Sequence, residues 1–262
     1  MNLSSTRLEG PVVALLSGGS ADQQILETAS ALARRPESGR LILVSTVGAE
    51  VPPTSTDGLR VEYVSGVRDA AGAAEAQASS AGAGCLIVPS WPRIARPLFR
   101  HAPCPLLFVP RREPPEGPIL VPVDFSRPSR QAARFALTLG RPVLLLHVYR
   151  VPLGWHKLGW TYAEFARRME VRCRQDMADV AAELNEGPVE TALEMAGDPA
   201  SCILHSARTR RVSCIVLASP RRTWAAAALP GVAERVALNA EVPVWVLRDA
   251  RPMSFLEAIC KG

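Results

Sequence analysis

The stretch Ile119-Leu120-Val121-Pro122-Val123-Asp124-Phe125-Ser126 carries the clearest sign of the fold. Five apolar residues end at an acidic residue, and a serine then precedes a helical pattern. A short apolar run bounded by polar residues is typical of a strand that is buried on both faces of a parallel sheet. Such sheets bind ligands beyond the carboxyl ends of their strands. The stretch therefore predicts a central strand with Asp124 at its tip.

Nine more apolar runs have the same character, and most of them alternate with helical stretches, which is typical of successive βα units. They are Pro11–Leu16, Leu41–Val47, Val61–Val64, Cys85–Pro89, Pro105–Val109, Val143–Val148, Val189–Leu193, Cys214–Ala218 and Val242–Leu247. Five of the ten predicted strands precede a proline-rich stretch and five follow it. We expect an α/β fold with two open, five-stranded parallel sheets of the flavodoxin or Rossmann kind.

The proline-rich stretch Pro110–Pro118 reads PRREPPEGP and suits neither a helix nor a central strand. We interpret it as a linker between two domains. The predicted boundaries are a first domain over 1–110, a linker over 111–118, a second domain over 119–249 and a C-terminal tail over 250–262.

The two predicted domains match each other in order and spacing, which indicates a duplication. The paired positions are Ser17 with Asp124, Asp69 with Asp198, Cys85 with Cys214, Ser90 with Ser219, and Pro105 with Pro243. The first copy has about 22 fewer residues between its second and third strands. In the second copy this region, Thr161–Leu184, has apolar residues at three- and four-residue spacing and predicts an amphipathic helix. We expect the first copy to lack that helix.

Composition narrows the class of protein. Lys and Arg exceed Asp and Glu by five in 262 residues, and the basic residues are not interleaved with aromatics, so we expect no nucleic-acid partner. The six cysteines show no metal-ligand spacing, and no apolar run is long enough to cross a bilayer. We therefore expect no metal, no membrane association and a cytoplasmic location.

The second copy resembles a universal stress protein domain. The resemblance rests on the opening stretch, on Leu144-Leu145-Leu146-His147-Val148, on Gly197-Asp198-Pro199, and on Gly231–Val236 followed by Val242-Pro243-Val244. It extends more weakly to the first copy. The family implies a role in stress response, an open sheet with helices on both faces, and fifth strands that meet when two domains pair.

In the nucleotide-binding members of that family, an aspartate after the first strand contacts adenosine, and a G-x2-G-x9-G-[ST] loop after the fourth strand wraps the phosphates. The resemblance therefore implies an ATP or AMP site in the second domain alone. Its expected residues are Pro122, Val123, Asp124, Val148, Ala218, Ser219, Arg221, Gly231 and Val232. Ala218 and Arg221 replace two of the three glycines and Val232 replaces the hydroxyl residue, so the resemblance leaves open whether the site still binds nucleotide.

The first copy departs further from the family pattern. Ser17 stands where the aspartate belongs, and the loop after Ser90 is shorter and lacks glycine. The glycine-rich segment Ser17–Ser20 is either a phosphate-binding loop or an ordinary turn between strand and helix. We expect the turn, and a first domain with a structural role.

No catalytic constellation stands out from the sequence. His147 ends a predicted strand and is interpreted as a packed, hydrogen-bonded residue rather than a base. Trp155 and Trp160 lie in a loop that is either a lid or docking segment, or packs on the neighbouring helix. We expect a regulatory binding module, with a nucleotide-free scaffold and a weak ATP hydrolase as alternatives. A protein partner or a homodimer is also expected.

Overall fold

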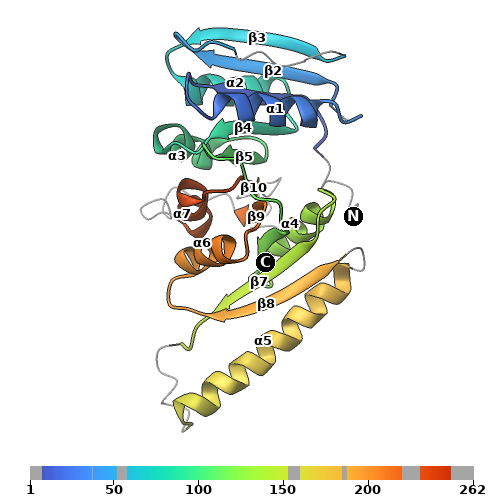
Figure 1. Cartoon of the computed structure of the whole chain (residues 1–262), viewed down its shortest axis with the longest axis vertical. Helices are drawn as coiled ribbons and strands as arrows, with labels where there is room; N and C mark the ends of the chain where they lie inside the picture. Colours follow the sequence, from blue (N-terminus) through green and yellow to red (C-terminus); the bar gives the residue numbers. More distant parts are fainter. Residues whose placement is uncertain are drawn as a thin grey trace, which may run out of the picture.

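The computed structural model describes residues 8–36, 38–51, 58–152, 160–184, 188–219 and 231–248. It contains a single ten-stranded sheet with helices on both faces, and the two halves of the chain lie at opposite ends of it (Figure 1). The strand order is β3-β2-β1-β4-β5-β10-β9-β6-β7-β8. Each half therefore has the same internal order, with its first strand between its second and its fourth.

The elements follow the predicted alternation of strand and helix. The first half contains β1 (Val12–Leu16), α1 (Asp22–Ala33), β2 (Arg40–Thr46), β3 (Arg60–Val67), α2 (Ala70–Ser80), β4 (Cys85–Pro89), α3 (Pro92–His101) and β5 (Leu106–Val109). The second half contains β6 (Ile119–Pro122), α4 (Arg127–Leu137), β7 (Val143–Tyr149), α5 (Tyr162–Leu184), β8 (Val189–Met195), α6 (Pro199–Thr209), β9 (Cys214–Ser219), α7 (Val232–Asn239) and β10 (Val244–Arg248). All ten predicted strands are confirmed, with ends that shift by a few residues.

The two halves join through their fifth strands, as the family resemblance implied. β5 and β10 pair antiparallel, whereas every other pair in the sheet is parallel. The two expected five-stranded sheets are thus halves of one continuous sheet. Pairing at this seam satisfies backbone groups that two separate sheets would leave exposed at their edges. The antiparallel seam also places the carboxyl ends of the two halves at opposite edges of the sheet.

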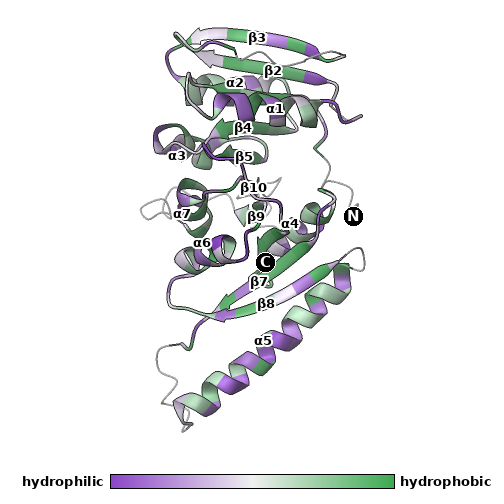
Figure 2. Cartoon of the chain, viewed as in Figure 1, coloured by the Kyte–Doolittle hydropathy of each residue, from purple (hydrophilic) through white to green (hydrophobic). Residues whose placement is uncertain are grey.

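Two apolar cores lie on the two faces of the sheet, and both extend across the seam. One contains the inner faces of α2, α3, α6 and α7, and the other those of α1, α4 and α5. The central strands are apolar along most of their length, whereas α5 alternates hydrophilic and hydrophobic residues (Figure 2). This difference follows from burial on two sides for a central strand and on one side for a surface helix.

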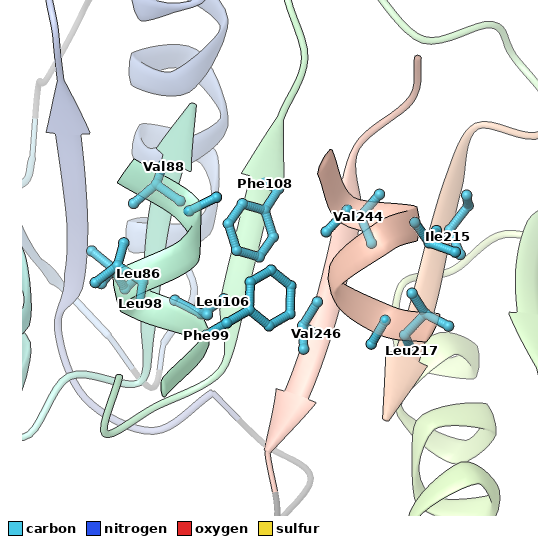
Figure 3. Close-up of a cluster of buried hydrophobic side chains, with 14 of the residues drawn as sticks. Leu86, Val88, Leu98, Phe99, Leu106, Phe108, Ile215, Leu217, Val244 and Val246 are labelled. Carbon is cyan, nitrogen blue, oxygen red and sulfur yellow. The ribbon is translucent and has the colours of Figure 1, made fainter. Parts of the chain in front are cut away.

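The seam is packed by aromatic and branched side chains from both halves (Figure 3). Phe108 of β5 is fully buried, pairs with Val244 of β10, and stacks on Phe99 with ring centroids 5.0 Å apart. On the other face, Trp245 of β10 meets Phe135 of α4 edge-on at 5.2 Å. Because these aromatic side chains are almost fully buried, the seam is part of the core and not a loose contact between two units.

α5 confirms the predicted amphipathic helix, and the described part of the first half has no counterpart to it. Its buried residues, Cys173, Met177, Val180 and Leu184, all lie in its second half. A helix of 23 residues is about 34 Å long, whereas the seven residues of β8 span about 23 Å, so the helix extends past the strand. In the first half, β3 occupies the position of β8, and its Tyr63 is 59% exposed.

The structure also bears on other sequence-based expectations. No helix among the described residues is long and apolar enough to cross a membrane, and the described residues hold no cluster of metal-ligating side chains.

The ring of Trp160 lies 5.7 Å from the ring of Phe165, and the guanidinium of Arg168 lies 4.4 Å from the centroid of the Trp160 ring. Trp160 thus packs on α5, while Trp155 lies outside the described residues.

Candidate functional site

The candidate site of the second half lies where β6 and β9 separate. These neighbouring strands pair only at Ile119 with Cys214 and at Leu120 with Ile215, and the described pairing ends there. β6 continues to β7 on one side and β9 to β10 on the other, so the strand order reverses between them. Open parallel sheets form their ligand crevice at this point, beyond the carboxyl ends of the strands.

Asp124 follows β6 and stands exposed at the carboxyl edge of the sheet. Its Oδ1 accepts hydrogen bonds from the backbone N–H of Ser126 at 3.1 Å and from the Ser126 hydroxyl at 2.5 Å. Partial burial acts to raise the pKa of Asp124, but hydrogen bonds from Ser126 and Ser129 outweigh it and hold the pKa below its ordinary value. The group is therefore a carboxylate at neutral pH. A carboxylate has about four acceptor positions, so it can accept further donors from a ligand.

The side chain of Phe125, the residue after Asp124 in the chain, contacts that of His147, and the sequence did not predict this contact. Their ring centroids are 4.2 Å apart, and His147 donates from Nδ1 to the backbone oxygen of Val123 at 2.7 Å. This confirms His147 as a packed, hydrogen-bonded residue. Phe125 has φ of +65°, a left-handed conformation that costs a residue with a Cβ about 1–2 kcal/mol. The Phe125 ring is positioned by its contact with His147 and by packing against the core on the α4 side.

The other residues expected at the site fall into three groups. Ala218 and Ser219 end β9, and Gly231 and Val232 begin α7, so the structure places these four at the same edge as Asp124. Gly231 is the N-cap of α7 and supplies no side-chain hydrogen bond, which leaves the first N–H groups of the helix without a side-chain cap. Arg221 lies outside the described residues.

Pro122, Val123 and Val148 are positioned by the strands β6 and β7. Val123 is 3% exposed and belongs to the core, whereas its backbone oxygen holds His147. Pro122 is half-buried at the end of β6, and Val148 is half-buried and packs against the core on the α6 side. These residues support the edge at which Asp124 stands, and the exposed functional groups come from their neighbours.

The first half has closed the equivalent turn with its own carboxylate. Asp22 is 3% exposed and accepts from the backbone N–H groups of Ser17 at 3.0 Å and Gly18 at 2.7 Å. In the second half, Ser129 is the counterpart of Asp22, and its hydroxyl faces the Asp124 N–H at 3.4 Å. Aspartate and serine have thus exchanged places between the copies. The glycine-rich segment Ser17–Ser20 is an ordinary turn, because the Asp22 side chain already accepts from the N–H groups of Ser17 and Gly18.

The same turn of the first half is also covered by a side chain. Trp91 follows β4, and its ring packs so closely on Gly19 that a Cβ at that glycine would lie 2.5 Å from a ring carbon. Arg111 lies 5.6 Å from the centroid of the same ring. The indole therefore covers the turn that follows β1. The shortened loop after Ser90 and the absence of an aspartate at 17 were the sequence signals of this difference between the copies.

Comparison with known proteins identifies the family. Residues 117–248 match the model of the universal stress protein family. A functionally unknown protein from Pseudomonas aeruginosa PAO1 has a similar structure, with a TM-score of 0.67 and 18% identity over 96% of both chains. A universal stress protein from Archaeoglobus fulgidus DSM 4304 gives a TM-score of 0.60 and 14% identity over 90% of this chain and 98% of its own. Among curated proteins, none matches this chain.

Proposed function

Because the chain belongs to the universal stress protein family, we propose that its second half is a regulatory module that binds an adenine nucleotide, ATP or AMP, without chemical conversion. The observation that carries this proposal is the exposed, ionised carboxylate of Asp124 at the point where β6 and β9 separate. The hydroxyls of a ribose and the amino group of adenine are donors, and a carboxylate held by Ser126 is a matching acceptor.

The phosphate end of the nucleotide is assigned to the beginning of α7. Helix N-termini bind anions because their first N–H groups are free and the helix dipole is positive there. Gly231 has no side chain to occupy those groups. In this assignment Ser219, at the end of β9, lies between the two ends of the ligand.

A thermal-shift titration with ATP, AMP and cyclic AMP tests the proposal. A ligand at one hundred times its dissociation constant stabilises the folded protein by about 2.7 kcal/mol. We expect at least one of the three to raise the melting temperature of the native chain, and Asp124→Ala to abolish most of that rise. Ser17→Ala is the matched control, because Ser17 holds the equivalent position in the first half, and it should leave the rise unchanged.

No stabilisation of the native chain at millimolar nucleotide would refute the proposal and favour a nucleotide-free scaffold.

A second outcome concerns catalysis. Phosphate release from ATP above the Asp124→Ala background would show that binding is accompanied by hydrolysis. The proposal includes recognition of the nucleotide-bound protein by a protein partner or by a second copy of the chain. Analytical ultracentrifugation with and without nucleotide measures association with a second copy.

A further inference from the structure

A cavity of about 360 Å³ lies in the second half, at the opposite edge of the sheet from Asp124. The linker passes its mouth with Arg112, Glu113 and Pro115. The C-terminal ends of α6 and α7, together with the residues that follow them, complete the lining: Leu204, Ala207, Arg208, Arg211, Asn239, Ala240, Glu241 and Val242. Its volume is in the range of small-molecule sites.

The cavity combines an apolar floor with a basic rim. Ala207 and Val242 are less than one tenth exposed and form the floor with Leu204, Ala240 and Pro115. Three arginines and two glutamates stand at the rim, and Arg208 pairs with Glu241 at 3.8 Å. Within the described part of the chain, neither Arg112 nor Arg211 has a carboxylate at ion-pairing distance. Arg112 and Arg211 therefore add positive charge to the rim, which Glu113 offsets only in part.

Arg211 follows the C-cap of α6 in a left-handed conformation, a position that glycine usually holds at the end of a helix. Its φ is +48°, and it and Phe125 are the two described non-glycine residues with positive φ. The counterpart of Arg211 in the first half is Gly82, which has φ of +60°. The backbone contact is conserved between the copies, because a Cβ at Gly117 would meet the Arg211 oxygen and a Cβ at Gly10 would meet the Gly82 oxygen. The second half thus holds an arginine where the first half has the unstrained residue.

The carbonyl groups at the end of α6 accept from backbone N–H groups, including that of Arg211 itself, and do not need an arginine side chain as a cap. The N–H of Arg210 bonds to Ser206, that of Arg211 to Arg208, and that of Val212 to Ala207. The guanidinium of Arg211 is therefore available to a ligand at the cavity. Arg208 has no basic counterpart either, because Ser79 holds its place in the first half.

From these observations we propose that this amino-edge cavity binds a small amphipathic anion, with an apolar body on the floor and a carboxylate or phosphate at Arg112 and Arg211. Guanidinium groups form paired hydrogen bonds with such anions. The site is separate from the nucleotide crevice, since it lies at the other ends of the same strands.

Isothermal titration calorimetry of the full chain with octanoate and with octyl phosphate tests the proposal and tells the two anionic groups apart. We expect saturable binding of at least one of them at millimolar concentration. Octanol, which lacks the charge, and inorganic phosphate, which lacks the apolar body, should bind at least about tenfold more weakly, the loss expected for one charge-assisted contact. Saturating ATP should leave the binding unchanged.

Arg211→Gly is the decisive variant, because it installs the residue of the first half. It should fold with a melting temperature no lower than that of the native chain and bind the anion about tenfold more weakly. Arg112→Gln should weaken binding in the same direction, while Arg60→Gln on β3 removes one charge far from the cavity and should have no effect. The proposal is overturned if neither anion binds, if octanol binds equally well, or if both Arg211→Gly and Arg112→Gln bind as the native chain does.

Discussion

The two halves of this molecule share a strand order and differ at the carboxyl ends of their strands. In the first half, Asp22 is turned inward onto the N–H groups of its own turn, and Trp91 covers the space beside it. In the second half, the serine is inside and Asp124 is outside. The difference teaches that two copies of one fold can place an acid inside or outside the same turn while the order of the strands stays unchanged.

Strain follows the same division. Phe125 and Arg211 of the second half have positive φ, and their counterparts in the first half, Gly18 and Gly82, have φ of +75° and +60°. The backbone bends alike in both copies, but the first half has glycine at both bends. Both bends of the second half thus carry a side chain that the first half lacks.

The largest expected loss of stability is at the seam between β5 and β10, because both halves share the core there. Phe108→Ala removes a fully buried ring that stacks on Phe99. We expect the free energy of unfolding to fall by about 4 kcal/mol, as is usual for loss of a buried phenylalanine. Urea denaturation followed by circular dichroism and by tryptophan fluorescence should give one coincident transition, because both cores cross the seam. Two separate transitions would show that the halves are independent units.

The exchange of aspartate and serine is tested by replacing Asp22 and Asp124, each in turn, with alanine. Asp22→Ala removes a buried carboxylate that accepts from the N–H groups of Ser17 and Gly18, and it should lower the free energy of unfolding by about 2 kcal/mol. Asp124→Ala removes an exposed carboxylate and should change it by less than about 0.5 kcal/mol without ligand. Chemical denaturation of both variants measures the contrast. Equal losses would mean that Asp124 has a structural role like that of Asp22.

The cost of the left-handed bend can be measured in the half that lacks a side chain there. Gly18→Ala should lower the free energy of unfolding by about 1 kcal/mol. A Cβ at Gly18 would meet only Ala49, at 3.7 Å, so the loss reports backbone strain alone. Thermal denaturation against Gly48→Ala, which has φ of +78° and open space around it, provides the comparison. A neutral result for Gly18→Ala would remove the argument from strain at Phe125.

The smallest effect concerns an ion pair that links α6 to α7 in the second half. Arg235 donates to both carboxylate oxygens of Asp198 at 2.7 Å, and Arg235 and Ser201 hold the pKa of Asp198 well below its ordinary value. A lowered pKa in the folded state stabilises the protein above the ordinary aspartate pKa of about 4 and loses that contribution as pH falls below it. The counterpart of Arg235 is Pro97, so the first half has no such pair.

Melting temperatures at pH 7 and pH 3 check this prediction. Arg235→Gln should melt at a slightly lower temperature than the native chain at pH 7 and should differ less from it at pH 3. Both groups are partly exposed, so added salt should shrink the difference further. A difference that is the same at both pH values would show that Arg235 contributes by packing rather than by charge.

The sequence alone predicted the local structure well, for a physical reason. Runs such as Ile119–Val123 and the three- and four-residue spacing in α5 record burial on two sides or on one, and burial patterns are local. The duplication and the missing helix of the first half followed from spacing. The comparison of Asp124 with a ligand-binding aspartate came from the family resemblance of the residues around it.

Other features depended on residues that are distant in the chain. Trp91 covers the turn after β1 only because Gly19, some seventy residues earlier, allows the ring to approach. Three further features also join segments that are distant in the chain. They are the contact between Phe125 and His147, the single continuous sheet, and the cavity between the linker, α6 and α7. The sequence by itself determined which segments are strands and helices and in what order, because apolar periodicity is read along the chain. Only the tertiary structure decided which acid is buried, which is exposed and where charge lacks a partner, because those properties belong to contacts between segments.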